Sequence, residues 1–111
     1  MFLVLTLTGC GGAPQVTPAG TPAVTIQLSA YNSKFEQTSL SVMAGAPFAI
    51  EFNNKDSLPH NVSIASGPPG STGEIFSGPG ERLYVFPALA IGTYTFHCEV
   101  HPDMTGTIQA T

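Results

Sequence analysis

The sequence predicts an all-β domain, an antiparallel-rich β-sandwich of seven or eight short strands. Two observations carry this prediction. From Ala23 onward, short runs of alternating apolar and polar residues are separated by turn signals, and no stretch shows helical periodicity. The composition agrees, because 12 Gly and 10 Pro without any Trp suit a turn-rich β protein. A chain of 111 residues is long enough for one such domain and too short for two.

Residues 1–9 (MFLVLTLTG) are interpreted as a truncated lipoprotein signal peptide. The run is too short to cross a bilayer, which takes about 20 residues, but it suits the apolar region of a signal. With the following cysteine it resembles the end of a bacterial lipoprotein signal, so we expect Cys10 to be lipidated and to tether the chain to a membrane. The basic region of a signal is missing, so either the true start lies upstream or the signal interpretation is wrong. The alternative is a buried strand or a free cysteine.

Residues 10–22 contain this cysteine and then GGAPQVTPAGTP, a segment rich in Gly, Pro and Thr with no apolar periodicity. Such a composition predicts a flexible linker between anchor and domain. An ordered arm lying on the domain is the alternative. The folded domain is therefore expected over residues 23–111.

Within the domain, period-2 alternation predicts the strands and Gly/Pro clusters separate them. The turn at 53–57 and the breaks at 66–70 and 78–80 are polar or rich in Gly and Pro. The expected strands cover residues 24–28, a segment from 35 to 42, and residues 48–52, 62–64, 83–86, 94–98 and 106–109.

Alternation along residues 94–98 sorts the side chains of this strand between two faces. Tyr94, Phe96 and Cys98 share the core-facing side, whereas His97 points the other way. The Cys98 sulfur can therefore enter a dry pocket, and we exclude His97 as a metal ligand.

The segment that follows this strand carries three potential metal ligands, Cys98, His101 and Met104, at the spacing C-x2-H-x2-M. Thiolate and thioether favour copper, and imidazole suits copper or zinc, but Met is a poor zinc ligand. A second imidazole would complete a His2Cys site with a long axial Met, which is the blue-copper electron-transfer centre. The sequence thus predicts one copper ion per chain.

His60 is the candidate for the fourth ligand, because the other two histidines are already assigned. It lies 38 residues before Cys98, so bringing them together costs roughly 3 kcal/mol of chain entropy unless the sandwich already sets the two strand ends side by side. Asn61 is expected to bridge the His60 segment to the Cys98 loop, or else to be an ordinary exposed polar residue. Pro102 is expected to pin the ligand loop. An apolar shell around the metal is expected from Phe48, Phe52, Phe96 and Leu58.

Several motifs around these residues resemble the cupredoxins, the type 1 blue copper family, and within it the amicyanin-like and plastocyanin-like proteins. They are Leu-Pro-His60-Asn-Val, Ser-Gly78-Pro79, Gly92-Thr-Tyr94 and His-Cys98-x-x-His101-Pro102-x-Met104. The resemblance covers about 90 residues, the length of one sandwich domain. It implies a Greek-key fold and one copper cycling between Cu(I) and Cu(II). His60, Cys98 and His101 would be equatorial ligands and Met104 the axial one, with the exposed edge of His101 as electron port.

Two carboxylates in the loop depart from the amicyanin pattern. Asp103 stands where amicyanin has an apolar residue, and Glu99 is the second acidic residue. We expect them to favour a basic docking surface on the protein electron donor and acceptor. The net charge of −4 argues against nucleic acid or anionic membrane surfaces as direct partners.

Together these features predict a single-electron carrier that is not an enzyme, because no further His cluster is left for a catalytic copper. We expect it to be extracytoplasmic, in the periplasm or at the cell surface, as a membrane-anchored lipoprotein. A copper chaperone or scavenger is the first alternative and shares the same ligands. A metal-free adhesion or assembly module is the last, and it would make the Cys-His-Met spacing a coincidence.

Overall fold

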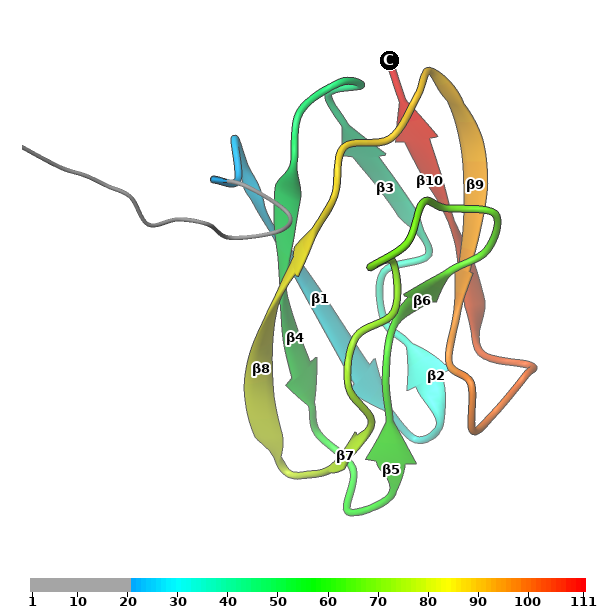
Figure 1. Ribbon diagram of the computed structural model, residues 1–111. Helices are drawn as coiled ribbons and strands as arrows, with labels where there is room; N and C mark the ends of the chain where they lie inside the picture. The colour runs from blue at the N-terminus through cyan, green and yellow to red at the C-terminus, as the bar shows by residue number, and fades with distance from the viewer. Residues whose placement is uncertain (1–20) are drawn as a thin grey trace, which may run out of the picture.

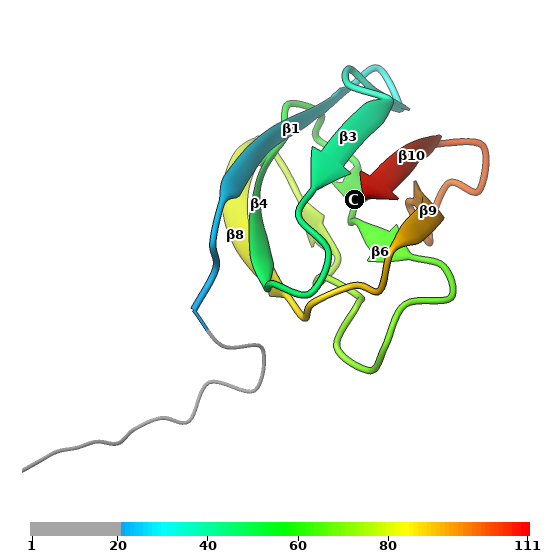
Figure 2. The same cartoon turned by 90° about the horizontal axis from the view of Figure 1, so that it is seen from above.

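The computed structural model describes residues 21–111, and these residues form a β-sandwich, as predicted. Two four-stranded sheets face each other, and a two-stranded pair lies at one end (Figures 1 and 2). The described part of the chain contains ten strands and no helix, and therefore no helix able to span a membrane. The predicted signal, Cys10 and most of the predicted linker lie outside the described residues.

The first sheet has the order β2-β1-β4-β8 and the second β3-β10-β9-β6. Each contains one parallel pair, β1 with β4 and β3 with β10, and the other pairs are antiparallel. The third pair is β5 with β7. The bounds are β1 (Thr25–Tyr31), β2 (Lys34–Phe35), β3 (Ser39–Val42), β4 (Phe48–Asn54), β5 (Pro59–His60), β6 (Ser63–Ile64), β7 (Phe76–Ser77), β8 (Gly80–Phe86), β9 (Gly92–His97) and β10 (Thr105–Ala110).

The expected segment from 35 to 42 divides into β2 and β3, which belong to different sheets. Its middle residues cross between the sheets and are held to β1, where the Ser29 N–H donates to Gln37 Oε1 (2.8 Å) and the Glu36 N–H to the Ser29 carbonyl (2.8 Å). The two-residue strands β5 and β7 were not expected. They are too short for periodicity to reveal them.

Aromatic rings fill the space between the sheets near the middle of the sandwich. Phe52 is fully buried and lies 5.9 Å from the rings of both Phe76 and Tyr84, and Phe35 lies 5.0 Å from Phe96. Gly106, paired with Phe96 across β9 and β10, leaves room for that ring, because a Cβ there would collide with it. The strand that leads to Cys98 is thus fixed by close packing.

The sandwich has two distinct ends. Backbone hydrogen bonds from Thr111 N–H to the Val42 carbonyl (3.1 Å) and from Gly45 N–H to the Leu89 carbonyl (2.9 Å) close one end. At the opposite end β5 and the 98–104 loop after β9 lie beside the turn between β1 and β2 (Figure 1). All the predicted ligands lie at this second end.

Candidate metal centre

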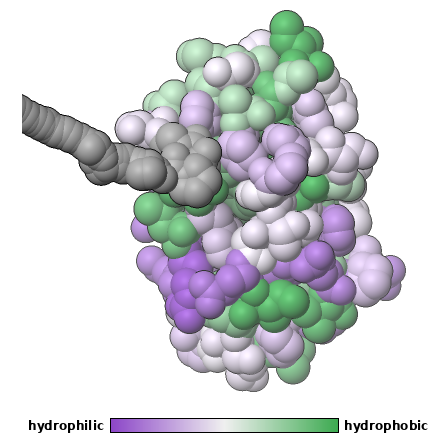
Figure 3. Space-filling model, viewed as in Figure 1, coloured by the Kyte–Doolittle hydropathy of each residue, from purple (hydrophilic) through white to green (hydrophobic). Residues whose placement is uncertain are grey.

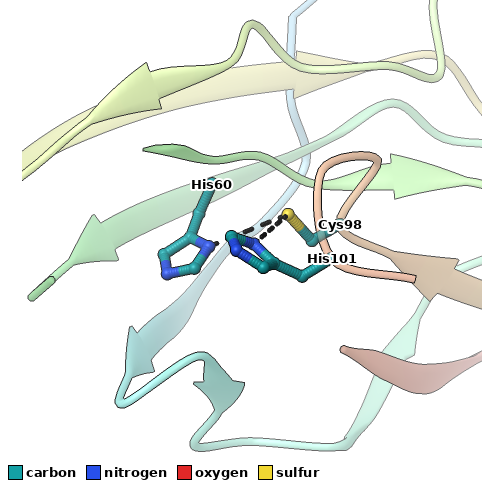
Figure 4. Close-up of side chains that lie close together, drawn as sticks. All are labelled: His60, Cys98 and His101. Carbon is teal, nitrogen blue, oxygen red and sulfur yellow. Dashed lines mark hydrogen bonds between the residues drawn. The ribbon is translucent and has the colours of Figure 1, made fainter. Parts of the chain in front are cut away.

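His60, Cys98 and His101 converge at this end of the sandwich (Figure 4). The Cys98 sulfur lies 3.8 Å from Nδ1 of His60 and 3.8 Å from Nδ1 of His101. Their potential ligand atoms all lie within 4.8 Å of one another, and no other such group of three occurs among residues 21–111. Two donors bound to one ion at about 2.0 and 2.3 Å in a trigonal arrangement stand about 3.7 Å apart, so the spacing fits one shared metal ion.

Strand pairing and loop closure bring these three side chains together. β5 pairs with β7, which sets His60 opposite Phe76. β9 ends at His97, and the loop after it is closed by hydrogen bonds from Cys98 N–H to the Met104 carbonyl (3.0 Å) and from Met104 N–H to the His101 carbonyl (2.8 Å). The loop is therefore held in one shape by its own backbone.

The ligand candidates differ in exposure. His60 and Cys98 are fully buried, and Met104, 3% exposed, belongs to the same buried cluster as Cys98. His101 is only partly buried. A metal held here would be shielded from water by the buried His60 and Cys98. Only the His101 imidazole would connect it to the protein surface.

Asp56 orients the His60 ring. Its Oδ2 lies 2.8 Å from Nε2 of His60, which leaves Nδ1 facing the sulfur. The same carboxylate accepts the backbone N–H groups of Asn32 (2.8 Å) and Ser33 (2.9 Å), both at φ 57° in the turn between β1 and β2. The hydrogen bond from Ser33, with those from His60 and Asn32, lowers the pKa of Asp56. The carboxylate thus stays ionised as the partner of His60.

Asp56 was not expected at the site from the sequence, where residues 53–57 are only a polar turn. A buried Asn54 builds this turn, since its Nδ2 donates to the carbonyls of Leu58 (2.9 Å) and Phe76 (3.1 Å). Gly78 packs so closely against the carbonyls of Asn54 and Asp56 that a Cβ would collide with both. An Asp four residues before a candidate His ligand was the only signal available.

Asn61 and Glu99 join the two ligand-bearing segments. Asn61 is fully buried, donates from Nδ2 to Glu99 Oε1 (3.0 Å) and the Gly73 carbonyl (3.0 Å), and accepts the Glu99 N–H (2.8 Å). The His60 segment and the Cys98 loop are therefore clamped together by the Asn61 side chain. The Glu99 carboxylate accepts one of these hydrogen bonds from Asn61, whereas the sequence predicted a role for Glu99 in docking alone.

Other expected positions are met only in part. Phe52 and Phe96 are buried as expected, but the Leu58 side chain is 48% exposed. Phe48 is buried at the other end, stacked on Phe86 at 5.4 Å, and so is not part of a shell around the site. Pro102 is exposed within the loop, and His97 lies outside the ligand group.

The donor set favours copper over other metals. A thiolate, two imidazoles and a thioether suit a soft or borderline ion, while zinc sites rarely use Met. The buried sulfur and the fixed loop would offer the same donors to a copper ion in either oxidation state.

Comparison with known proteins agrees with this geometry. The model of the Cupredoxin-like domain family matches residues 1–110. Amicyanin-alpha of Methylorubrum extorquens is 34% identical over 99 residues, covering 86% of this chain and 76% of its own. Amicyanin of Paracoccus denitrificans is 32% identical over 78 residues, covering 68% of this chain and 56% of its own.

Solved structures show the same fold. Auracyanin B superimposes with a TM-score of 0.70 at 24% identity, over 91% of this chain and 96% of its own. A Cu(I) amicyanin variant superimposes with a TM-score of 0.61 at 26% identity, over 78% of this chain and 82% of its own. Copper-containing nitrite reductase of Neisseria gonorrhoeae is 37% identical over 68 residues, but that match covers only 17% of the reductase.

Proposed function

The chain belongs to the cupredoxin-like family, and on that basis we propose that it is a mononuclear type 1 copper protein that carries single electrons between redox partners. When bound, the copper supplies the redox couple by cycling between Cu(I) and Cu(II). The observation that carries the proposal is the convergence of His60 and His101 on the buried sulfur of Cys98.

The proposed equatorial ligands are Nδ1 of His60, Nδ1 of His101 and the Cys98 thiolate, with Met104 as the weak axial ligand. Burial of His60 and Cys98 supports a site of low solvent access. Asp56, Asn61 and Pro102 are proposed to support the ligands. Asp56 orients His60, Asn61 holds the loop, and Pro102 restricts the backbone after His101.

Electrons are proposed to enter and leave at the His101 edge, where a protein donor or acceptor docks. His101 is the least buried of the three converging ligands. Val100 is 40% exposed beside it, and Asp103 is exposed in the same loop. A partner with an apolar centre and a basic rim suits this surface.

The proposed location is based on the N-terminal sequence. We propose that the protein acts outside the cytoplasm, in the periplasm or at the cell surface, with Cys10 carrying a lipid anchor. An apolar run ending in Leu-Thr-Gly-Cys supports this anchor. Intact-mass measurement of chain extracted from membranes tests it, because an unmodified Cys10 removes the anchor.

An enzymatic role is not part of the proposal. Within residues 21–111 the converging His60, Cys98 and His101 make the only cluster of its kind, so no second cluster supports a catalytic copper. The alternative expected from the sequence, a copper chaperone, would use the same ligands. It differs in kinetics, since a chaperone releases copper readily, whereas a carrier retains it through both oxidation states.

Copper loading of the purified chain tests the proposal. Oxidised protein should show the intense blue thiolate-to-copper absorption, which Cys98→Ser should abolish and Met104→Gln should only shift. Electron self-exchange should be fast, and a copper chelator should remove the metal slowly. A colourless complex, or rapid loss of copper to the chelator without electron exchange, would overturn the electron-carrier function.

A further inference from the structure

The end of the sandwich opposite the ligands carries no acidic or basic side chain. We define this apolar pole as residues 22–24, 41–47, 87–92 and 110–111. All ten charged residues of the sequence lie elsewhere. In the space-filling view the hydrophilic side chains gather in the lower half of the molecule, away from this pole (Figure 3). Although the chain has a net charge of −4, this end has no acidic side chain that an anionic lipid surface would repel.

Large apolar side chains are exposed at the same pole. Ile91 is 81% exposed, Met43 63% and Val24 43%. An open groove of about 430 Å³ runs beside Val24 and Met43, and it is lined by Ala23, Val24, Ser41, Val42, Met43 and Thr111. Exposed apolar side chains that gather on one surface mark an interaction site in a soluble domain.

The N-terminal segment enters the domain at this pole. Ala23 N–H donates to the Pro47 carbonyl (2.9 Å) and Ala49 N–H to the Val24 carbonyl (2.9 Å), which fixes the entry point beside the groove. Only residues 11–22 separate it from Cys10, and this many residues span at most about 40 Å. A lipid on Cys10 would therefore keep this pole within about 40 Å of the bilayer.

We propose that the apolar pole rests on the surface of a lipid bilayer. This inference rests on the anchored location proposed above. The tether keeps the pole close to the bilayer, so a few exposed apolar side chains suffice to hold it there. All the acidic side chains lie outside the pole, and those at the ligand end stay beyond the reach of an anionic surface, since its field decays over about 8 Å in physiological salt.

The consequence is an oriented carrier. With the pole on the bilayer, the partly exposed His101 edge faces away from the membrane. Docking partners would then approach from the aqueous side, or from membrane complexes whose redox site stands well clear of the lipid.

Hydroxyl-radical footprinting on vesicles tests this orientation. The full copper-loaded chain is coupled through the Cys10 thiol to a maleimide lipid in phosphatidylcholine vesicles, while Cys98 is protected by burial. We expect labelling of Met43 and Ile91 to fall several-fold relative to uncoupled protein. Labelling of Tyr31 and Leu58, exposed at the ligand end, should not change.

A pair of charged substitutions provides the matched variant. Met43→Glu with Ile91→Glu should restore labelling of Val24 to its solution level although the chain stays coupled. Leu83→Glu, at a position 61% exposed on β8, should leave the protection intact.

Three results would overturn the inference. The first is equal labelling of both ends of the domain, and the second is protection of the ligand end instead of the pole. The third is protection of Met43 and Ile91 without vesicles, together with a dimer in sedimentation. That result would assign the pole to a contact with a second copy of the chain. Chemical coupling does not need cellular lipidation. An unmodified Cys10 in the intact-mass measurement would therefore contradict only the natural anchor. Unprotected Met43 and Ile91 in the footprinting experiment would contradict the contact between the pole and the bilayer.

Discussion

Nε2 of His60 lies 2.8 Å from Oδ2 of Asp56, four residues earlier in the chain, and Nδ1 of the same ring lies 3.8 Å from the Cys98 sulfur. The ring therefore connects a carboxylate to the candidate metal position. Through Asp56 this connection extends to the N–H groups of Asn32 and Ser33. A turn far from the ligand loop in sequence thereby helps to fix the direction of one ligand.

Asp56→Asn should weaken copper binding by about 10- to 100-fold, the usual effect of removing a partner of a ligating histidine. The amide keeps the size of the side chain but loses the charge that fixes the ring. Competition with a copper chelator measures the affinity. Asp103→Asn, an exposed carboxylate in the ligand loop, is the control and should change it little. Equal effects of both variants would show that Asp56 acts only through net charge.

Asp56 should also contribute to stability in a pH-dependent way. Its native pKa lies below the value of about 3.9 for an unfolded Asp, because the Ser33 N–H and its other partners favour the ionised form. The unfolded state then binds more protons, so the contribution is present above about pH 4 and lost as pH falls through the native pKa. The free energy of unfolding of copper-free protein, measured with urea, should fall more steeply on acidification for the wild type than for Asp56→Asn. Parallel curves would contradict this.

Asn61→Ala should destabilise the domain by about 2–3 kcal/mol, since it removes three hydrogen bonds from a fully buried position. Glu99→Gln is the matched variant, because a Gln side-chain oxygen can still accept from Asn61. It should cost less than about 1 kcal/mol. Urea unfolding of copper-free protein measures both. A large loss in Glu99→Gln would mean that the charge, rather than the hydrogen bond, holds the clamp.

Gly106→Ala should destabilise the domain by about 1–3 kcal/mol, because the new methyl group collides with the buried Phe96 ring. The ring cannot move without disturbing the strand that ends at the Cys98 loop. Gly80→Ala is the control, since its nearest neighbour in space would be the Phe76 ring at 3.7 Å, an ordinary contact. Thermal unfolding separates the two, and similar melting temperatures would refute the packing argument.

The sequence alone determined the fold class and the donor types. Period-2 alternation is a local property of a strand, and it predicted the sandwich and the inward face of Phe96 and Cys98. The spacing from Cys98 to Met104 is also local, so three candidate ligands were found without knowing any long-range contact.

Only the tertiary structure decided how distant segments meet. Which end of the sandwich holds Phe48, why Leu58 faces solvent, and that Asp56 and Glu99 turn toward His60 and Asn61 all depend on strand register and turn shape. Register and turn shape arise from packing between residues tens of positions apart. No local pattern of residue types records them, and so the supporting contacts of the site had to come from the fold.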